Sequence, residues 1–182
     1  METEKVLGTK ERVKVLEFIL DNPSKKASVR GLSKTLGLSP SHLSKTIRIL
    51  EKNSILKGNR INLENPLVRN LKTMFNLKKL LEMKVVEKSR LVIKDMKGIG
   101  VYGSWASGTN TEDSDIDLWI KSRRVIEEKS LAKIHTFIIT KTGSEVSILS
   151  LWPGKIEELK KDKTFYYSLH FGSIILWGEN ID

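Results

Sequence analysis

The chain has 182 residues, of which 39% are hydrophobic, so it can form one ordinary domain or two small ones, and global disorder is not expected. It has no cysteine, which excludes disulfides, thiolate zinc sites and a cysteine nucleophile. The net charge of +10 is unevenly distributed: +6 in residues 1–66, +6 in 67–97 and −2 in 98–182. A basic front and a weakly acidic back indicate different partners, a polyanion for the first and metal with nucleotide for the second. The alternative is that surplus lysine only keeps the protein soluble.

Targeting signals are missing from the sequence. The start METEKVLGTK lacks the apolar core of a signal peptide. No apolar run approaches the roughly 20 residues that a membrane-spanning helix needs. We therefore expect a cytoplasmic protein with no membrane contact.

Helical spacing and capping signals recur through the first part of the chain. Apolar side chains at helical intervals predict a first helix over residues 10–20. A second helix is expected to end at Gly37, and a third to begin with Ser39 as its cap and Pro40 at its first position. Two helices joined by so short a turn form a helix-turn-helix.

The stretch SVRGLSKTLGLSPSHLSKTIRILEKNSILKGNRINLE, residues 28–64, resembles the winged helix-turn-helix domains of prokaryotic regulators. Gly58-Asn59 between two short apolar runs looks like the hairpin of the wing. In that family the third helix enters the major groove of duplex DNA. The resemblance implies these DNA-facing residues: Ser39, Ser41, His42, Lys45, Arg48, Lys57 and Arg60. Folds of this kind also serve as protein-docking modules, which is the alternative.

A proline marks the expected boundary between a first domain, residues 1–66, and a second, residues 67–182. Leucines and methionines then recur at three and four residues, which predicts a long helix, and a further amphipathic helix is expected over 86–96. These connecting helices, residues 67–97, precede a catalytic core at 98–182. Their apolar stripe is typical of ordinary core or of a homodimer face.

Three motifs that bind phosphate or metal partly match the segment KGIGVYGSWASGTNTEDSDIDLWI, residues 97–120. The dinucleotide motif G-x-G-x-x-G needs a strand before its first glycine, whereas a helix is expected before Gly98. A P-loop needs Lys-Ser/Thr after its last glycine, but Ser104 follows Gly103. An EF-hand loop needs a glycine where Leu118 stands. None of the three motifs is therefore satisfied.

The remaining interpretation of this segment is a strand at 99–102, followed by Gly103-Ser104, a polar loop and a second strand. Because residues two apart on a strand face the same side, Asp115 and Asp117 present two adjacent carboxylates. Such a pair repels unless a cation lies between them, and Mg²⁺ accepts these oxygens together with triphosphate oxygens. Gly103 lets the backbone approach a phosphate, to which Ser104 can donate from its N–H and hydroxyl.

The block GSWASGTNTEDSDIDL resembles the pattern GSxARGxxxxxSDIDL of the minimal nucleotidyltransferases, in the superfamily of DNA polymerase beta. The resemblance extends to FGSIILWG near the C-terminus and covers residues 67–182. It implies an α/β (α+β) protein in which a small mixed-sheet nucleotidyltransferase domain follows the winged helix-turn-helix. It also implies that Asp115 and Asp117 are catalytic metal ligands and that Gly103 and Ser104 bind nucleotide.

Two departures from this pattern bear on activity. Ser107 stands where the family usually has arginine, which removes a phosphate contact. The third carboxylate of the family aligns with Ser147, whereas Glu145 lies two residues earlier on the same expected strand face. We expect Glu145 to supply the missing catalytic carboxylate. The alternative is that the site has lost its general base.

The resemblance implies a Mg²⁺-dependent enzyme that transfers a nucleoside monophosphate from a nucleoside triphosphate, with ATP the expected substrate, to an unknown acceptor. The winged helix would bring the activity to DNA. The alternative is a DNA-binding transcriptional regulator or antitoxin-like protein, whose degenerate transferase domain binds nucleotide or a protein partner without turnover.

Overall fold

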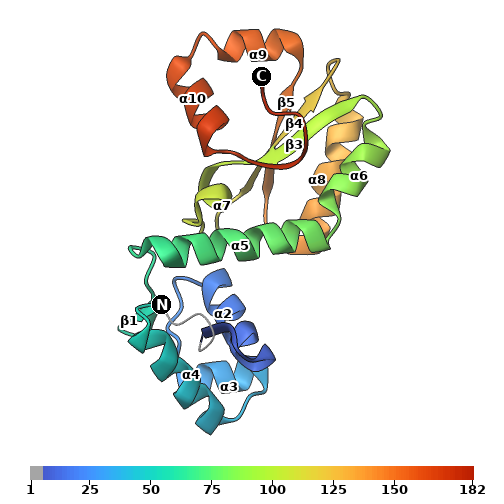
Figure 1. Ribbon diagram of the computed structural model, residues 1–182. Helices are drawn as coiled ribbons and strands as arrows, with labels where there is room; N and C mark the ends of the chain where they lie inside the picture. Colours follow the sequence, from blue (N-terminus) through green and yellow to red (C-terminus); the bar gives the residue numbers. More distant parts are fainter. Residues whose placement is uncertain (1–5) are drawn as a thin grey trace. The chain divides into compact units, whose positions relative to one another are not determined.

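The computed structural model describes residues 6–182 and divides the chain into two compact units, which meet in sequence between Lys72 and Thr73. This division lies inside helix α5 (Pro66–Glu82), further along the chain than the expected boundary at Pro66. Figure 1 shows the elements of each unit. Within the described residues, no helix is both long and apolar enough to cross a bilayer.

The first unit contains three capped helices followed by a short hairpin. Its elements are α2 (Lys10–Asp21), α3 (Val29–Leu36), α4 (Pro40–Lys52), β1 (Leu56–Lys57) and β2 (Arg60–Ile61). The predicted caps are present, because the Ser39 hydroxyl accepts from the His42 N–H and Gly37 ends α3 in the left-handed region. The hairpin turns through Gly58 and Asn59, both at positive φ, as a two-residue turn requires. The predicted helices and hairpin are confirmed.

The second unit is built on a four-stranded mixed sheet in the order β5-β4-β3-β6. β3 (Met96–Val101) pairs antiparallel with both β4 (Ile116–Ser122) and β6 (Ile174–Gly178), while β5 (Val146–Leu151) is parallel to β4. The helices are α6 (Val85–Val92), α7 (Gly103–Ser107), α8 (Glu128–Thr142), α9 (Pro153–Leu159) and α10 (Lys163–Gly172). The expected mixed α/β fold with a small mixed sheet is confirmed.

The predicted helix over residues 86–96 is wrong at its end. Helix α6 ends at Val92, and Met96 is the first residue of β3, where it pairs with Ser122 of β4. The apolar spacing of this segment fits helix and strand equally well. Pairing with β4 decides the outcome, because it satisfies the backbone groups of Met96 while burying its side chain.

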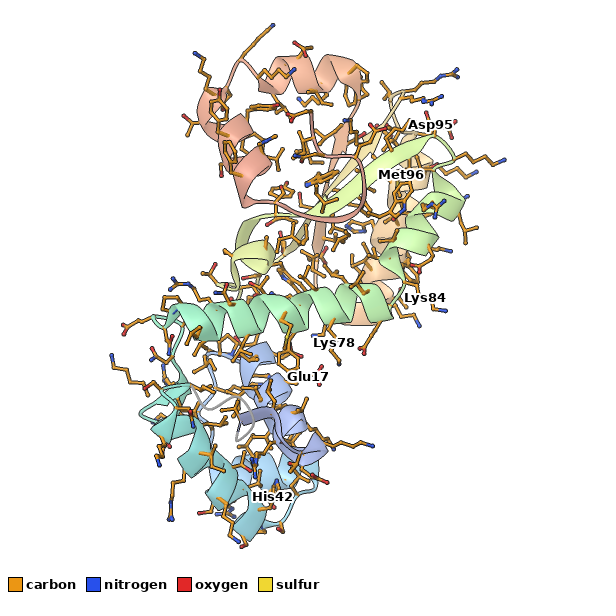
Figure 2. The ribbon with its side chains drawn as sticks, viewed as in Figure 1. Glu17, His42, Lys78, Lys84, Asp95 and Met96 are labelled. Atoms are coloured by element: carbon orange, nitrogen blue, oxygen red, sulfur yellow. The ribbon has the colours of Figure 1, made fainter. Side chains whose placement is uncertain are left out.

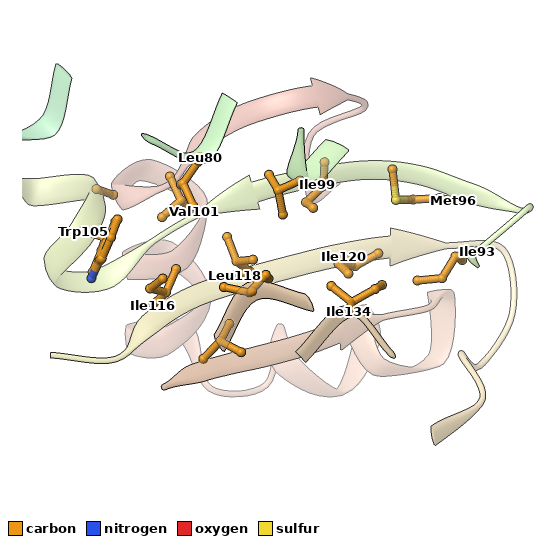
Figure 3. Close-up of a cluster of buried hydrophobic side chains, with 14 of the residues drawn as sticks. Leu80, Ile93, Met96, Ile99, Val101, Trp105, Ile116, Leu118, Ile120 and Ile134 are labelled. Carbon is orange, nitrogen blue, oxygen red and sulfur yellow. The ribbon is translucent and has the colours of Figure 1, made fainter. Parts of the chain in front are cut away.

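Both faces of the sheet carry a hydrophobic core. On one face Ile116, Leu118 and Ile120 pack with α6 and α8, as Figure 3 shows for part of this cluster. On the other face Trp119, which is fully buried, packs with α9, α10 and Ile181. The sequence predicted a core only on the first face. Trp119 lies on the other face of β4, which also carries the half-buried Asp117. The functional side chains therefore lie at the margin of a packed face.

Gly100 is required by close packing against Trp119. A Cβ built on Gly100 would lie 2.4 Å from Cζ2 of the Trp119 indole, which is too close for any real contact. Gly100 itself lies inside strand β3, paired with both neighbouring strands, so it is no part of a phosphate loop. The rejection of the dinucleotide motif is confirmed.

We predict that Gly100→Ala destabilises the second unit by about 1–3 kcal/mol, because the added methyl group must displace the buried indole or the strand. Urea unfolding followed by tryptophan fluorescence measures this directly, since all four tryptophans lie in the second unit. Gly172→Ala is the matched control, because its added Cβ meets no atom within 4 Å. Equal unfolding free energies for the two variants would contradict the packing role of Gly100.

Candidate nucleotide and metal site

The junction between β3 and α7 brings a glycine against a carboxylate. The Tyr102 N–H donates to the Asp117 carbonyl at 3.0 Å, which extends the pairing of β3 with β4 by one bond. Gly103 then begins α7 at φ +63°, and a Cβ at this position would lie 2.4 Å from Oδ2 of Asp117. Any side chain at Gly103 would fill the space next to the Asp117 carboxylate. The glycine is therefore required both by its backbone conformation and by this space.

Asp115 and Asp117 form an acidic pair at the start of β4. Asp117 is half-buried in the strand, and Asp115 is exposed immediately before it. Burial raises the pKa of the Asp117 carboxyl above its usual value, and the negative charge of Asp115 raises it further. The structure brings the two predicted carboxylates together, and the charge of Asp115 disfavours the ionised form of Asp117 unless a cation is bound.

Ser147 occupies the position next to Asp117 on the neighbouring strand. The parallel register of β4 and β5 pairs Asp117 directly with Ser147. The Ser147 side chain hydrogen-bonds the Tyr102 hydroxyl, which lowers the pKa of this phenol. Burial and the nearby Asp117 have the opposite and larger effect, so the Tyr102 pKa is raised overall. Two hydroxyl groups therefore stand beside Asp117 where the family pattern has a third carboxylate.

Glu145 lies apart from the aspartate pair. It is exposed and precedes β5, and one of its carboxylate oxygens is 3.9 Å from Nε2 of His135 on α8. Helix α8 packs on the opposite face of the sheet from Asp117. Throughout residues 6–182, no three His, Asp or Glu side chains are grouped closely enough to hold a metal ion. Glu145 lies one residue before β5, and the ion pair that it forms among the described residues is with His135 on α8 and not with the aspartate pair.

Mg²⁺ nevertheless fits the two aspartates. Their donors are hard carboxylate oxygens, and Mg²⁺ is commonly held by one or two carboxylates together with substrate phosphates. A cation between them would offset the repulsion from Asp115 that helps to raise the pKa of Asp117. Asp115 and Asp117 would hold it.

Ser104 and Ser107 lie on the short helix α7. No hydrogen-bond partner is recorded for the Ser104 hydroxyl among the described residues, so this group can donate to a ligand. The Ser107 hydroxyl instead contacts Thr109 Oγ1 at 2.8 Å and the Ser104 carbonyl at 3.3 Å. The Ser107 hydroxyl is therefore used in hydrogen bonds within α7 and the turn after it, and it does not replace the phosphate contact of the family arginine.

Most of the predicted DNA-facing residues of the first unit are exposed: Ser39, Ser41, Lys45, Arg48, Lys57 and Arg60. His42, labelled in Figure 2, differs because it is half-buried and its Nε2 is buried without a recorded hydrogen-bond partner. Lys57 forms an exposed ion pair with Glu64 at 3.0 Å, which partly offsets its charge. The Ser39 hydroxyl is used as a helix cap.

Tyr102 is a site residue that sequence reasoning did not identify. It lies at a strand end directly before Gly103, and no sequence signal separates it from an ordinary core aromatic residue. Only the pairing of β3 with β4, and of β4 with β5, places its hydroxyl near Asp117 and Ser147.

A protein-family model described as "Nucleotidyltransferase domain" matches residues 83–174. No curated protein was found to match the chain. Solved structures that resemble it include a toxin–antitoxin structure with AMP-PNP (18% identity, 57% of this chain and 74% of the other, TM-score 0.43). A second is the tri-AMPylated Shewanella oneidensis HEPN toxin in complex with MNT antitoxin (15%, 59% and 73%, TM-score 0.39). A third is a putative nucleotidyltransferase from Sulfolobus solfataricus (14%, 65% and 94%, TM-score 0.36).

The family match spans half of the chain and contains β3, α7, β4 and β5, the elements that carry Gly103, Asp115, Asp117 and Ser147. It agrees with the motif on which the resemblance was based. The chain belongs to the nucleotidyltransferase domain family.

Proposed function

We propose that the second unit transfers a nucleoside monophosphate from a nucleoside triphosphate, with ATP the expected donor, to a hydroxyl group of an acceptor. The observation that carries this proposal is the contact of Gly103 with the Asp117 carboxylate, next to Asp115. This contact places a backbone segment that can approach a phosphate next to two carboxylates that can hold a metal ion. Gly103 and Ser104 bind the triphosphate through their N–H groups and the Ser104 hydroxyl.

In this reaction the acceptor oxygen forms a bond to the α-phosphorus, while the bond from that phosphorus to the β-phosphate oxygen breaks and pyrophosphate leaves. Mg²⁺, when bound, supplies charge neutralisation for the triphosphate and for the attacking oxygen. Asp115 and Asp117 would hold the cation, and through it they would orient the donor phosphate toward the acceptor. The proton of the acceptor hydroxyl passes to Asp117 or to solvent, since Ser147 and Tyr102 are poor bases at neutral pH.

The transfer proposal is tested with α-labelled nucleoside triphosphates, Mg²⁺ or Mn²⁺, and candidate protein and nucleic-acid acceptors. We expect label on an acceptor with the natural chain and a loss of about 100-fold or more with Asp117→Asn, because the substitution removes a charged metal ligand. Glu145→Gln is the matched control, and we expect it to keep full activity because its carboxylate faces His135. Absence of label with either metal, or label that survives Asp117→Asn, would refute the proposal.

A second function is favoured by one specific observation, the hydroxyl group of Ser147 at the position paired with Asp117. A site with two carboxylates and no third can bind nucleotide or a protein partner without turnover. The chain would then act as a regulator or an antitoxin-like protein. Nucleotide binding without transfer is the outcome that distinguishes this function from the first.

We predict that Ser147→Asp raises the transfer rate by roughly 10- to 100-fold, since a carboxylate at this register position can accept the acceptor proton or add a metal contact. The initial rate of label transfer is the readout, and Ser44→Asp, which adds the same charge at an exposed serine of the first unit, is the control. If the natural chain is inactive and Ser147→Asp is active, the binding function is correct. An unchanged rate in Ser147→Asp would show that the third carboxylate is not what limits the reaction.

We propose further that the first unit is a winged helix-turn-helix that binds duplex DNA, chiefly through phosphates. Lys45 and Arg48 support this, because they lie on the exposed side of α4 while Leu43, Ile47 and Leu50 are buried on the other. The net charge of +6 in residues 1–66 provides the attraction to a polyanion. The partial burial of His42 favours Lys45 and Arg48 over His42 as groove contacts.

We predict that affinity for duplex DNA falls steeply between about 50 and about 200 mM salt, and that Arg48→Ala lowers the log–log salt slope by about 1. Fluorescence anisotropy with a labelled duplex measures both quantities. Lys161→Ala removes the same charge from the second unit and should leave the slope unchanged. Salt-independent binding, or equal slopes for the two variants, would exclude phosphate recognition by α4.

A further inference from the structure

A groove between α6 and α8 is separate from the nucleotide site. The two helices lie side by side in the second unit (Figure 1), and an open hollow of about 600 Å³ runs along α8 with Lys88 of α6 at its side. They pack on the sheet face opposite Trp119, so the groove lies across the sheet from Asp117. Four lysines line it: Lys88, Lys129, Lys133 and Lys141.

The lysines form a rim around an apolar floor. Ala132 and Phe137 line the groove between them, and the hydrocarbon stems of the lysines extend this apolar surface. Among the residues that the structure describes, none of the four ammonium groups has a carboxylate partner, although other lysines of the chain do. The rim therefore carries an uncompensated positive charge beside apolar surface. This combination selects a ligand that is both acidic and apolar.

The length of the groove matches a helix. Lys129 and Lys141 lie twelve residues apart on α8, which corresponds to about 18 Å along the helix axis. A groove of this length beside two packed helices accepts a third helix, whose apolar side chains at every third and fourth residue would contact the floor.

Two contacts disfavour a nucleic acid as the ligand. The Lys88 ammonium lies 5.6 Å from the centre of the Phe137 ring, so it occupies a ring face on which a base would stack. The Thr140 hydroxyl donates to the Thr136 carbonyl at 2.7 Å, so it is used within α8 and is not offered to phosphate.

We propose that this groove binds an acidic amphipathic helix of a partner protein. The apolar face of that helix packs on Ala132 and Phe137, and its Asp or Glu side chains pair with the lysine rim. The proposal is independent of the transfer reaction, since the groove shares no residue with the nucleotide site.

The test uses the full chain and a labelled 18-residue peptide with leucines at helical spacing flanked by glutamates. Two control peptides have the same composition in scrambled order or lysine in place of glutamate. We expect the amphipathic acidic peptide to bind at least about tenfold more tightly than either control, as measured by fluorescence anisotropy. Because the chain has no cysteine, Thr136→Cys carries a single environment-sensitive fluorophore that should shift only with this peptide.

The charge-reversal variant Lys133→Glu/Lys141→Glu should weaken peptide binding at least about tenfold. The matched control Lys161→Glu/Lys163→Glu changes the net charge equally on exposed residues outside the groove and should bind the peptide like the natural chain. Circular dichroism and the thermal midpoint show that each variant is folded. Equal binding of the scrambled peptide, displacement by an 18-nucleotide single strand, or self-association that the groove variant abolishes would each overturn the proposal.

Discussion

The hydrogen bond from the Tyr102 N–H to the Asp117 carbonyl is the constraint on which the candidate site depends. It continues the antiparallel pairing of β3 with β4 to the last residue before α7, so the glycine that follows must lie against the Asp117 side chain. The Gly103 backbone and the Asp117 carboxylate, for which we propose phosphate and metal binding, are thus brought together by main-chain pairing.

The position of Asp117 on the sheet explains its electrostatics. It shares a strand face with Trp119, which is fully buried two residues later under α9 and α10. Asp117 therefore lies where a packed face ends, and its carboxylate is partly removed from water next to a second carboxylate. Such an arrangement disfavours the ionised form of Asp117, and the cation that we propose would offset this effect. Functional sites commonly carry this kind of local cost, which the surrounding fold offsets.

The third position of the site departs from the pattern of the minimal nucleotidyltransferases. Ser147 has the strand register of a third ligand but offers a hydroxyl, and that hydroxyl is linked to Tyr102. Glu145 has the right chemistry but lies before the strand begins, with its carboxylate near His135. Ser147 therefore has the strand position of a third ligand, whereas Glu145 has the carboxylate. Whether the site catalyses transfer or only binds nucleotide depends on how the Tyr102 and Ser147 hydroxyl groups interact with an acceptor hydroxyl.

Local chemistry in the sequence determined the capped helices of the first unit, the Gly58-Asn59 turn, and the pairing of Asp115 with Asp117. Each of these depends on residues a few positions apart, whose geometry follows from caps, turns and strand alternation. The family motif likewise identified the second unit, because its residues are contiguous. Tertiary structure alone decided that Met96 joins β3, that Gly100 makes room for Trp119, and that Tyr102 and Ser147 meet beside Asp117. These contacts join strands distant in sequence, and the pairing register that creates them is set by the whole sheet and by no local pattern.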